Sequence, residues 1–137
     1  MSIQELVDGL TLECLHNDQL LVYTFSTAQR EAVDAWYDSV AGLLQGWSRS
    51  NPFLMVVDAS AAMLIPTPYA RQRSNDLSKL NPDITGRTAL IIQDNLTGQI
   101  FRFLLSQLQR TSKAKRDRQA FTTRAEAIAW LEELLTL

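Results

Sequence analysis

The stretch Phe53-Leu54-Met55-Val56-Val57-Asp58 decides how the rest of the chain is interpreted. It is a short apolar run that ends in an acidic residue, and such a run is typical of a parallel β-strand covered on both faces. A second run of this kind, Ala89-Leu90-Ile91-Ile92, ends near Asp94. Two buried strands of this type indicate a parallel sheet whose connections are right-handed crossovers.

Helical patterns lie between and beyond these runs. A capping box of Ser26 and Gln29 predicts the first helix start, at Ser26 or the next residue. Thr67-Pro68 predicts a second helix, mostly polar, that extends to about Leu80, and a capping box at Thr123 opens the last one. The first, third and last helices carry apolar stripes: Val33, Trp36, Val40, Leu43, Leu44 and Trp47; Ile100, Phe101, Leu104, Leu105 and Leu108; Ala127, Ile128, Leu131, Leu134 and Leu135.

Residues 10–15 alternate and residues 20–25 are almost entirely apolar, which predicts an N-terminal β-hairpin whose first strand lies nearer the edge. Residues 119–121 are read as a short final strand. The predicted fold class is therefore α/β, with a mixed, mostly parallel sheet of about 4–5 strands and about four helices covering both its faces.

Length and composition limit the classes of protein that this chain can represent. Its 137 residues predict a single domain over residues 1–137. A net charge of −2 argues against a nucleic-acid partner. One cysteine cannot form an intrachain disulfide, and no apolar run approaches the ~20 residues of a membrane helix. With no signal-peptide pattern at the N-terminus, we expect a cytoplasmic protein without membrane insertion.

The order of elements, the strand end Val56-Val57-Asp58-Ala59-Ser60, and the closing segment from Phe121 to Leu131 resemble the STAS superfamily. This group includes the bacterial anti-sigma factor antagonists and their SpoIIAA-like relatives, and the resemblance covers about Leu10 to Leu135. It implies a non-enzymatic signalling module that binds a protein partner, either a regulator or a kinase-like protein.

The resemblance also implies a phosphorylated serine at the start of the helix after the central strand. Placing Asp58 and Ser60 on the family's Asp-x-Ser puts that serine at Pro68, which has no hydroxyl. Thr67, one position earlier, is the only hydroxyl left there. The resemblance therefore predicts a module without the usual serine switch, with Thr67 as the candidate for modification.

Ligands of open α/β sheets bind beyond the carboxyl ends of the strands, so we expect a site at that edge. The residues expected to gather there are Asp58, Ser60, Thr67, Asp94 and Thr97. Helix N-termini at Thr67 and near Thr97 favour an anion. The alternative is that Thr67, Asp94 and Thr97 only cap helices, which favour these residue types.

Catalytic chemistry has little support in the sequence. Asp58 and Asp94 suit Mg²⁺, but no glycine-rich phosphate loop or dinucleotide fingerprint accompanies them, so neither a metal nor a cofactor is predicted. The only histidine, His16, lies in a predicted turn that is exposed. The only cysteine, Cys14, is on the core-facing side of a strand. No nucleophile with a positioned base is evident.

Two surfaces remain as candidates for a partner. The polar second helix carries Tyr69, Arg71 and Arg73, and an ordinary exposed helix is the alternative explanation. The segment from Arg110 to Arg118 is basic and is interpreted as a solvated loop, or alternatively as a phosphate-binding patch.

Two functional hypotheses follow. The first is a STAS-like regulatory module, as a monomer or homodimer, that binds a protein through the second helix and the strand edge. The second is a protein that binds a small anionic ligand, or a weak metal-dependent enzyme, in the crevice around Asp58 and Asp94. A pocket of several hundred Å³ with convergent polar groups would favour the second.

Overall fold

The computed structural model describes residues 2–61 and 66–135. In this part of the chain six strands form one sheet: β1 (Ser2–Val7), β2 (Leu10–Leu15), β3 (Leu20–Phe25), β4 (Phe53–Asp58), β5 (Gly86–Ile91) and β6 (Arg116–Phe121). The helices described are α1 (Arg30–Gln45), α2 (Pro68–Ser78), α3 (Leu96–Thr111) and α4 (Arg124–Glu132).

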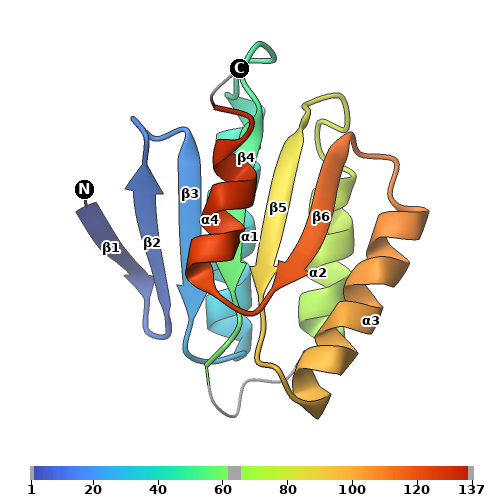
Figure 1. Cartoon of the computed structure of the whole chain (residues 1–137). Coiled ribbons are helices and arrows are strands. Elements are labelled where there is room, and N and C mark those ends of the chain that lie inside the picture. Colours follow the sequence, from blue (N-terminus) through green and yellow to red (C-terminus); the bar gives the residue numbers. More distant parts are fainter. Residues whose placement is uncertain (1, 62–65, 136–137) are drawn as a thin grey trace.

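The strands lie in the sheet in the same order as in the sequence (Figure 1). The pairs β1–β2 and β2–β3 are antiparallel, and β3–β4, β4–β5 and β5–β6 are parallel. The prediction of a mixed, mostly parallel sheet with helices on both faces is confirmed. Strand β1 was not predicted, so the predicted hairpin lies inside the edge of the sheet.

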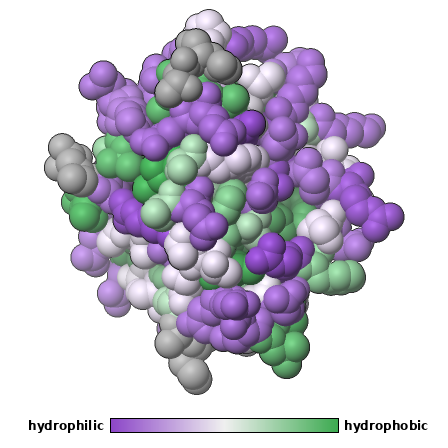
Figure 2. All heavy atoms as spheres, in the orientation of Figure 1, coloured by the Kyte–Doolittle hydropathy of each residue, from purple (hydrophilic) through white to green (hydrophobic). Residues whose placement is uncertain are grey.

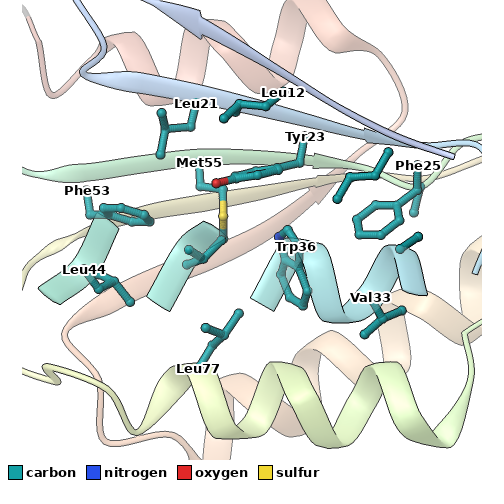
Figure 3. Close-up of a cluster of buried hydrophobic side chains, with 14 of the residues drawn as sticks. Leu12, Leu21, Tyr23, Phe25, Val33, Trp36, Leu44, Phe53, Met55 and Leu77 are labelled. Atoms are coloured by element: carbon teal, nitrogen blue, oxygen red, sulfur yellow. The ribbon is translucent and has the colours of Figure 1, made fainter. Parts of the chain in front are cut away.

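The two faces of the sheet are covered differently. On one face Leu54, Val56, Ala89 and Ile91 pack under α4, and each is at most 2% exposed. On the other face α1 covers the side chains of β2, β3 and β4. Figure 3 shows this second core, where Tyr23 and other side chains of the sheet point toward α1, with α2 beyond it.

Helix α2 packs against α1 more than against the sheet. The Tyr69 hydroxyl donates a hydrogen bond to the Asp34 carboxylate, and the Arg73 guanidinium lies 3.5 Å from the centre of the Tyr37 ring. Helix α3 contacts mainly β6. As a result, Thr88 and Leu90 of β5 are only half-buried on this face.

Two predicted boundaries are wrong. The first helix begins at Arg30, and its N-cap, Gln29, makes no side-chain capping bond. The predicted capping box needed the Gln29 side chain to bind the Ser26 N–H, but that N–H donates to the Gly9 carbonyl at 3.0 Å. The basic segment is not one loop, because α3 extends to Thr111 and β6 begins at Arg116.

Candidate functional site: a pocket beneath helices α2 and α3

A pocket of about 280 Å³ lies where α2 and α3 leave the sheet uncovered. Its floor is the face of β4, β5 and β6 opposite α4, and its walls come from α1, α2 and α3. The lining is predominantly apolar. We call this space the α2–α3 pocket.

The floor follows from strand alternation, because every second residue of a strand points to the same face. It consists of Phe53, Met55 and Val57 of β4, Thr88 and Leu90 of β5, and Arg116 and Arg118 of β6. The register places Met55 beside Thr88 and Thr88 beside Arg118. An apolar floor therefore becomes polar toward the β6 edge.

The inner face of α3 forms one wall of the pocket. Phe101, Leu104, Leu105 and Leu108 line it, and all four remain half-buried although the sequence pattern predicts a packed stripe. The Asn95 side chain caps this helix by accepting a bond from the Gly98 N–H at 2.9 Å. The pattern is thus a true amphipathic face, but the sheet leaves space below it.

Arg116 is a buried cation at the end of the pocket, only 5% exposed. Its guanidinium donates to the backbone carbonyls of Leu77, Leu80, Asn81 and Ile84 at 3.0–3.4 Å. Leu77 belongs to the carboxyl-terminal end of α2, where the helix dipole is negative and favours a cation, and the other three follow the helix. Burial lowers the pKa of Arg116. This residue therefore joins β6 to α2.

Arg118 lies two residues further along the same face of β6. Burial and the positive charge of Arg116 lower its pKa to about 10, although Asp117 opposes this change. Its guanidinium has one side-chain acceptor, Gln109 Oε1 of α3, at the long distance of 3.5 Å. Among the described residues no ion pair involves Arg118.

Sequence reasoning missed both arginines as site residues because it placed them in a solvated loop. The segment Arg116-Asp117-Arg118-Gln119 has no apolar alternation that would indicate a strand, because all four residues are polar. The strand pattern is visible only in Ala120 and Phe121, which the prediction did include.

The residues predicted at the strand ends lie outside the α2–α3 pocket. The Asp58 carboxylate accepts bonds from the Ser60 N–H at 3.0 Å and the Ser60 hydroxyl at 2.6 Å, which closes the turn after β4. Asp94 is exposed, and Thr97 is in the first turn of α3. The link between the two strand ends is made by Gln93, whose amide donates to the Ser60 carbonyl at 2.7 Å.

The predicted residues of α2 divide between two surroundings. Thr67 is the N-cap, because its hydroxyl accepts a bond from the Ala70 N–H at 3.0 Å. Tyr69 and Arg73 face α1, whereas Arg71 lines the pocket and is exposed. The polar residues of α2 therefore serve two places: some contact α1, and others lie at the mouth of the pocket.

His16 and Cys14 lie away from the pocket. His16 is exposed and bonds Glu132 at 2.8 Å, and burial raises the pKa of the Cys14 thiol. Within residues 2–61 and 66–135, histidine, cysteine and acidic side chains form no group suited to a metal ion. In the same part of the chain, none of the helices is both long and apolar enough to span a membrane.

The sheet order, the N-terminal antiparallel strands and the four helices define a mixed α/β protein of SpoIIAA-like fold. One solved structure with this fold is that of an uncharacterized protein of the DUF3478 family from Shewanella loihica PV-4. It matches 89% of this chain and 91% of its own length with a TM-score of 0.61, at 14% sequence identity. No protein-family model matches the sequence, and no curated protein is significantly similar to it.

Proposed function

We propose that this chain is a non-enzymatic regulatory module that binds a small, mainly apolar molecule in the α2–α3 pocket. The observation that carries the proposal is the pocket itself, about 280 Å³ in volume and mostly apolar. Small-molecule sites are usually concave and apolar with a few polar groups, and they begin at about 300 Å³. This proposal keeps one part of the second hypothesis from the sequence, the binding of a small ligand. It places the ligand in the α2–α3 pocket and not in the crevice around Asp58 and Asp94.

The packing around the pocket supports a ligand. Side chains of α3 that a closed core would bury, among them Phe101 and Leu105, stay half-exposed above the floor. Burying apolar surface contributes about 25 cal/mol per Å². A small apolar molecule would therefore gain binding energy from walls that already exist.

We expect the neutral dye N-phenyl-1-naphthylamine to bind saturably, with an increase in its fluorescence. At about 100 times its Kd it should raise the free energy of unfolding by about 2.7 kcal/mol, since it binds only the folded chain. The test variant is Ala70→Phe, because Ala70 lines the pocket and a phenyl ring there occupies its space. Its dye affinity should fall at least tenfold.

The matched control is Ala129→Phe, the same substitution at an exposed position of α4. It should bind the dye as the original chain does. Equal dye binding by the chain, Ala70→Phe and Ala129→Phe would contradict the proposal, because the dye would then be on a general apolar surface.

A second candidate function is the binding of a protein partner by α3. Leu96, Ile100 and Phe103 are 79%, 46% and 61% exposed, and they recur at helical spacing on the outer side of this helix. Exposed apolar stripes of this kind mark interaction sites. Figure 2, in the orientation of Figure 1, shows hydrophilic residues interspersed with apolar ones on the side of the molecule that carries α4.

We take a second copy of this chain as the occupant to be tested first. Sedimentation should give a concentration-dependent dimer for the chain and a monomer for Phe103→Ser, with unchanged thermal stability because Phe103 is exposed. Gln99→Ser, at another exposed position of α3, is the control. A chain that stays monomeric would exclude homodimerisation through α3.

A further inference from the structure

The charge balance of the α2–α3 pocket is incomplete. Arg116 and Arg118 point to the same face of β6 and both line the pocket. Neither takes part in an ion pair among the described residues. With the exposed Arg71 at the mouth, three arginines border this mainly apolar space. The two on the floor, Arg116 and Arg118, cost free energy unless each is compensated.

Arg116 is compensated by the protein itself. Four backbone carbonyls accept bonds from its guanidinium, so few of its N–H groups remain for another partner. Arg118 differs, because Gln109 Oε1 is the acceptor of its side chain and lies at 3.5 Å. Of the two arginines, Arg118 has the N–H groups to spare.

The surroundings of Arg118 supply further polar groups that face the same space. Thr88 is its neighbour across the β5–β6 ladder and places a hydroxyl on the pocket floor. Arg71 and Asn75 of α2, four residues apart and both exposed, border the pocket from the other side. No acidic residue lines the pocket within the described part of the chain.

We propose that the ligand is an amphipathic anion, with an apolar body over β4 and α3 and a single carboxylate bound by Arg118 and Thr88. This inference rests on the proposed function, and it names the chemical class of the ligand. The carboxylate supplies the missing negative charge. Its two oxygens match the planar guanidinium fork, and the bonds are strengthened because the site is partly desolvated.

A carboxylate fits better than a phosphate. Arg118 is the one uncompensated cation on the pocket floor, since Arg71 is exposed at the mouth and is solvated there. A carboxylate neutralises this single charge, whereas a phosphate group at neutral pH brings up to two negative charges. The β4 residues of the floor add to this. They extend from Phe53 to Val57, about 13 Å at the usual rise per strand residue, so the apolar body is expected to be extended.

The test compares decanoate with 1-decanol, which has the same chain length without the charge, by isothermal titration calorimetry. The chain should bind decanoate about 10- to 100-fold more tightly than decanol, as a charged hydrogen-bonded pair provides. Arg118→Met should remove that difference and leave decanol affinity unchanged. Thr88→Val should reduce it in part.

Stability gives an independent readout. Arg118→Met removes a desolvated cation beside Arg116, so the ligand-free variant should melt at the same temperature or higher, while its decanoate affinity falls. If Arg118 had only a structural role, Arg118→Met would lower both the melting temperature and the decanoate affinity. Arg102→Met, at an exposed position of α3, is the matched control and should change neither quantity.

The two proposals fail in different ways. If decanol and N-phenyl-1-naphthylamine bind but decanoate is no tighter, or if Arg118→Met keeps the preference for decanoate, the anionic class is wrong and the apolar pocket stands. If none of the three probes binds, the proposed function falls and the ligand class falls with it.

Discussion

Replacing Arg116 by methionine is expected to lower the free energy of unfolding by about 3 kcal/mol or more, because it removes a charged donor that serves four backbone carbonyls. Methionine has a similar length and is apolar, so the cavity left is small. The loss comes from the carbonyls of Leu77, Leu80, Asn81 and Ile84, which lose their donor. A buried acceptor without a partner costs about 1–3 kcal/mol.

The effect is expected to concentrate at the end of α2. Arg116 binds the Leu77 carbonyl in the last turn of this helix and three carbonyls of the segment that follows, and Leu77 and Ser78 are each 6% exposed. Urea denaturation followed by circular dichroism measures the change in unfolding free energy. Hydrogen exchange should show the amides at the C-terminal end of α2 losing protection first, since that end loses its anchor to β6.

Arg118→Met is the matched control, because it makes the same substitution two residues away on the same strand face. It should not destabilise, since Arg118 has no carboxylate partner in the described chain. Similar losses for the two variants would contradict the roles assigned to these arginines and would point to a general effect of charge on β6.

Replacing Gly86 by alanine is the second substitution expected to have a large effect. A Cβ at this position would lie 2.0 Å from the Phe53 carbonyl oxygen and 2.7 Å from the Phe53 nitrogen. Both are backbone atoms of the neighbouring strand β4, which pairs with Gly86 in register. They cannot move aside as a flexible side chain would, so the start of β5 must shift.

We expect Gly86→Ala to cost about 1–3 kcal/mol or more, the usual range for overpacking. It should also perturb the pocket floor, because Thr88 follows two residues later on β5. Gly42→Ala is the control, since a Cβ there meets nothing within 4 Å in α1. That variant should gain about 0.5–1 kcal/mol from helix propensity. Thermal and urea unfolding measure the change in unfolding free energy of both variants. Equal changes for Gly86→Ala and Gly42→Ala would contradict the steric role given to Gly86.

Much of the fold could be predicted because its signals are local. The apolar run from Phe53 to Val57 lies in the centre of the sheet and is buried on both faces up to Val56, so its composition alone indicated a parallel strand. The caps by Thr67 and Thr123 are confirmed, and their hydrogen bonds involve residues three apart. The Glu126 carboxylate accepts from the Thr123 hydroxyl and not from its N–H, so the second half of the predicted capping box differs. Such contacts depend little on the rest of the chain.

Edge elements were harder to predict. Strand β1 pairs on one side, and Ile3 is 67% exposed, so it carries no buried run. Strand β6 contains three charged residues, and one of them, Arg116, is buried. Nothing local distinguishes a buried arginine from a solvated one, because its acceptors come from residues 77–84, more than thirty positions earlier.

The sequence by itself determined the order of the elements from β2 to α4, the two apolar faces of the sheet and the helix starts at Thr67 and Thr123. The tertiary structure decided that α2 rests on α1, that α3 stands over an incompletely covered floor, and that Arg118 faces the space between them. The physical reason is that a pocket is the space that remains where neighbouring elements do not pack against each other. Spacing along a chain states which face of a helix is apolar, but the distance between that face and the sheet depends on every element that holds the helix in place.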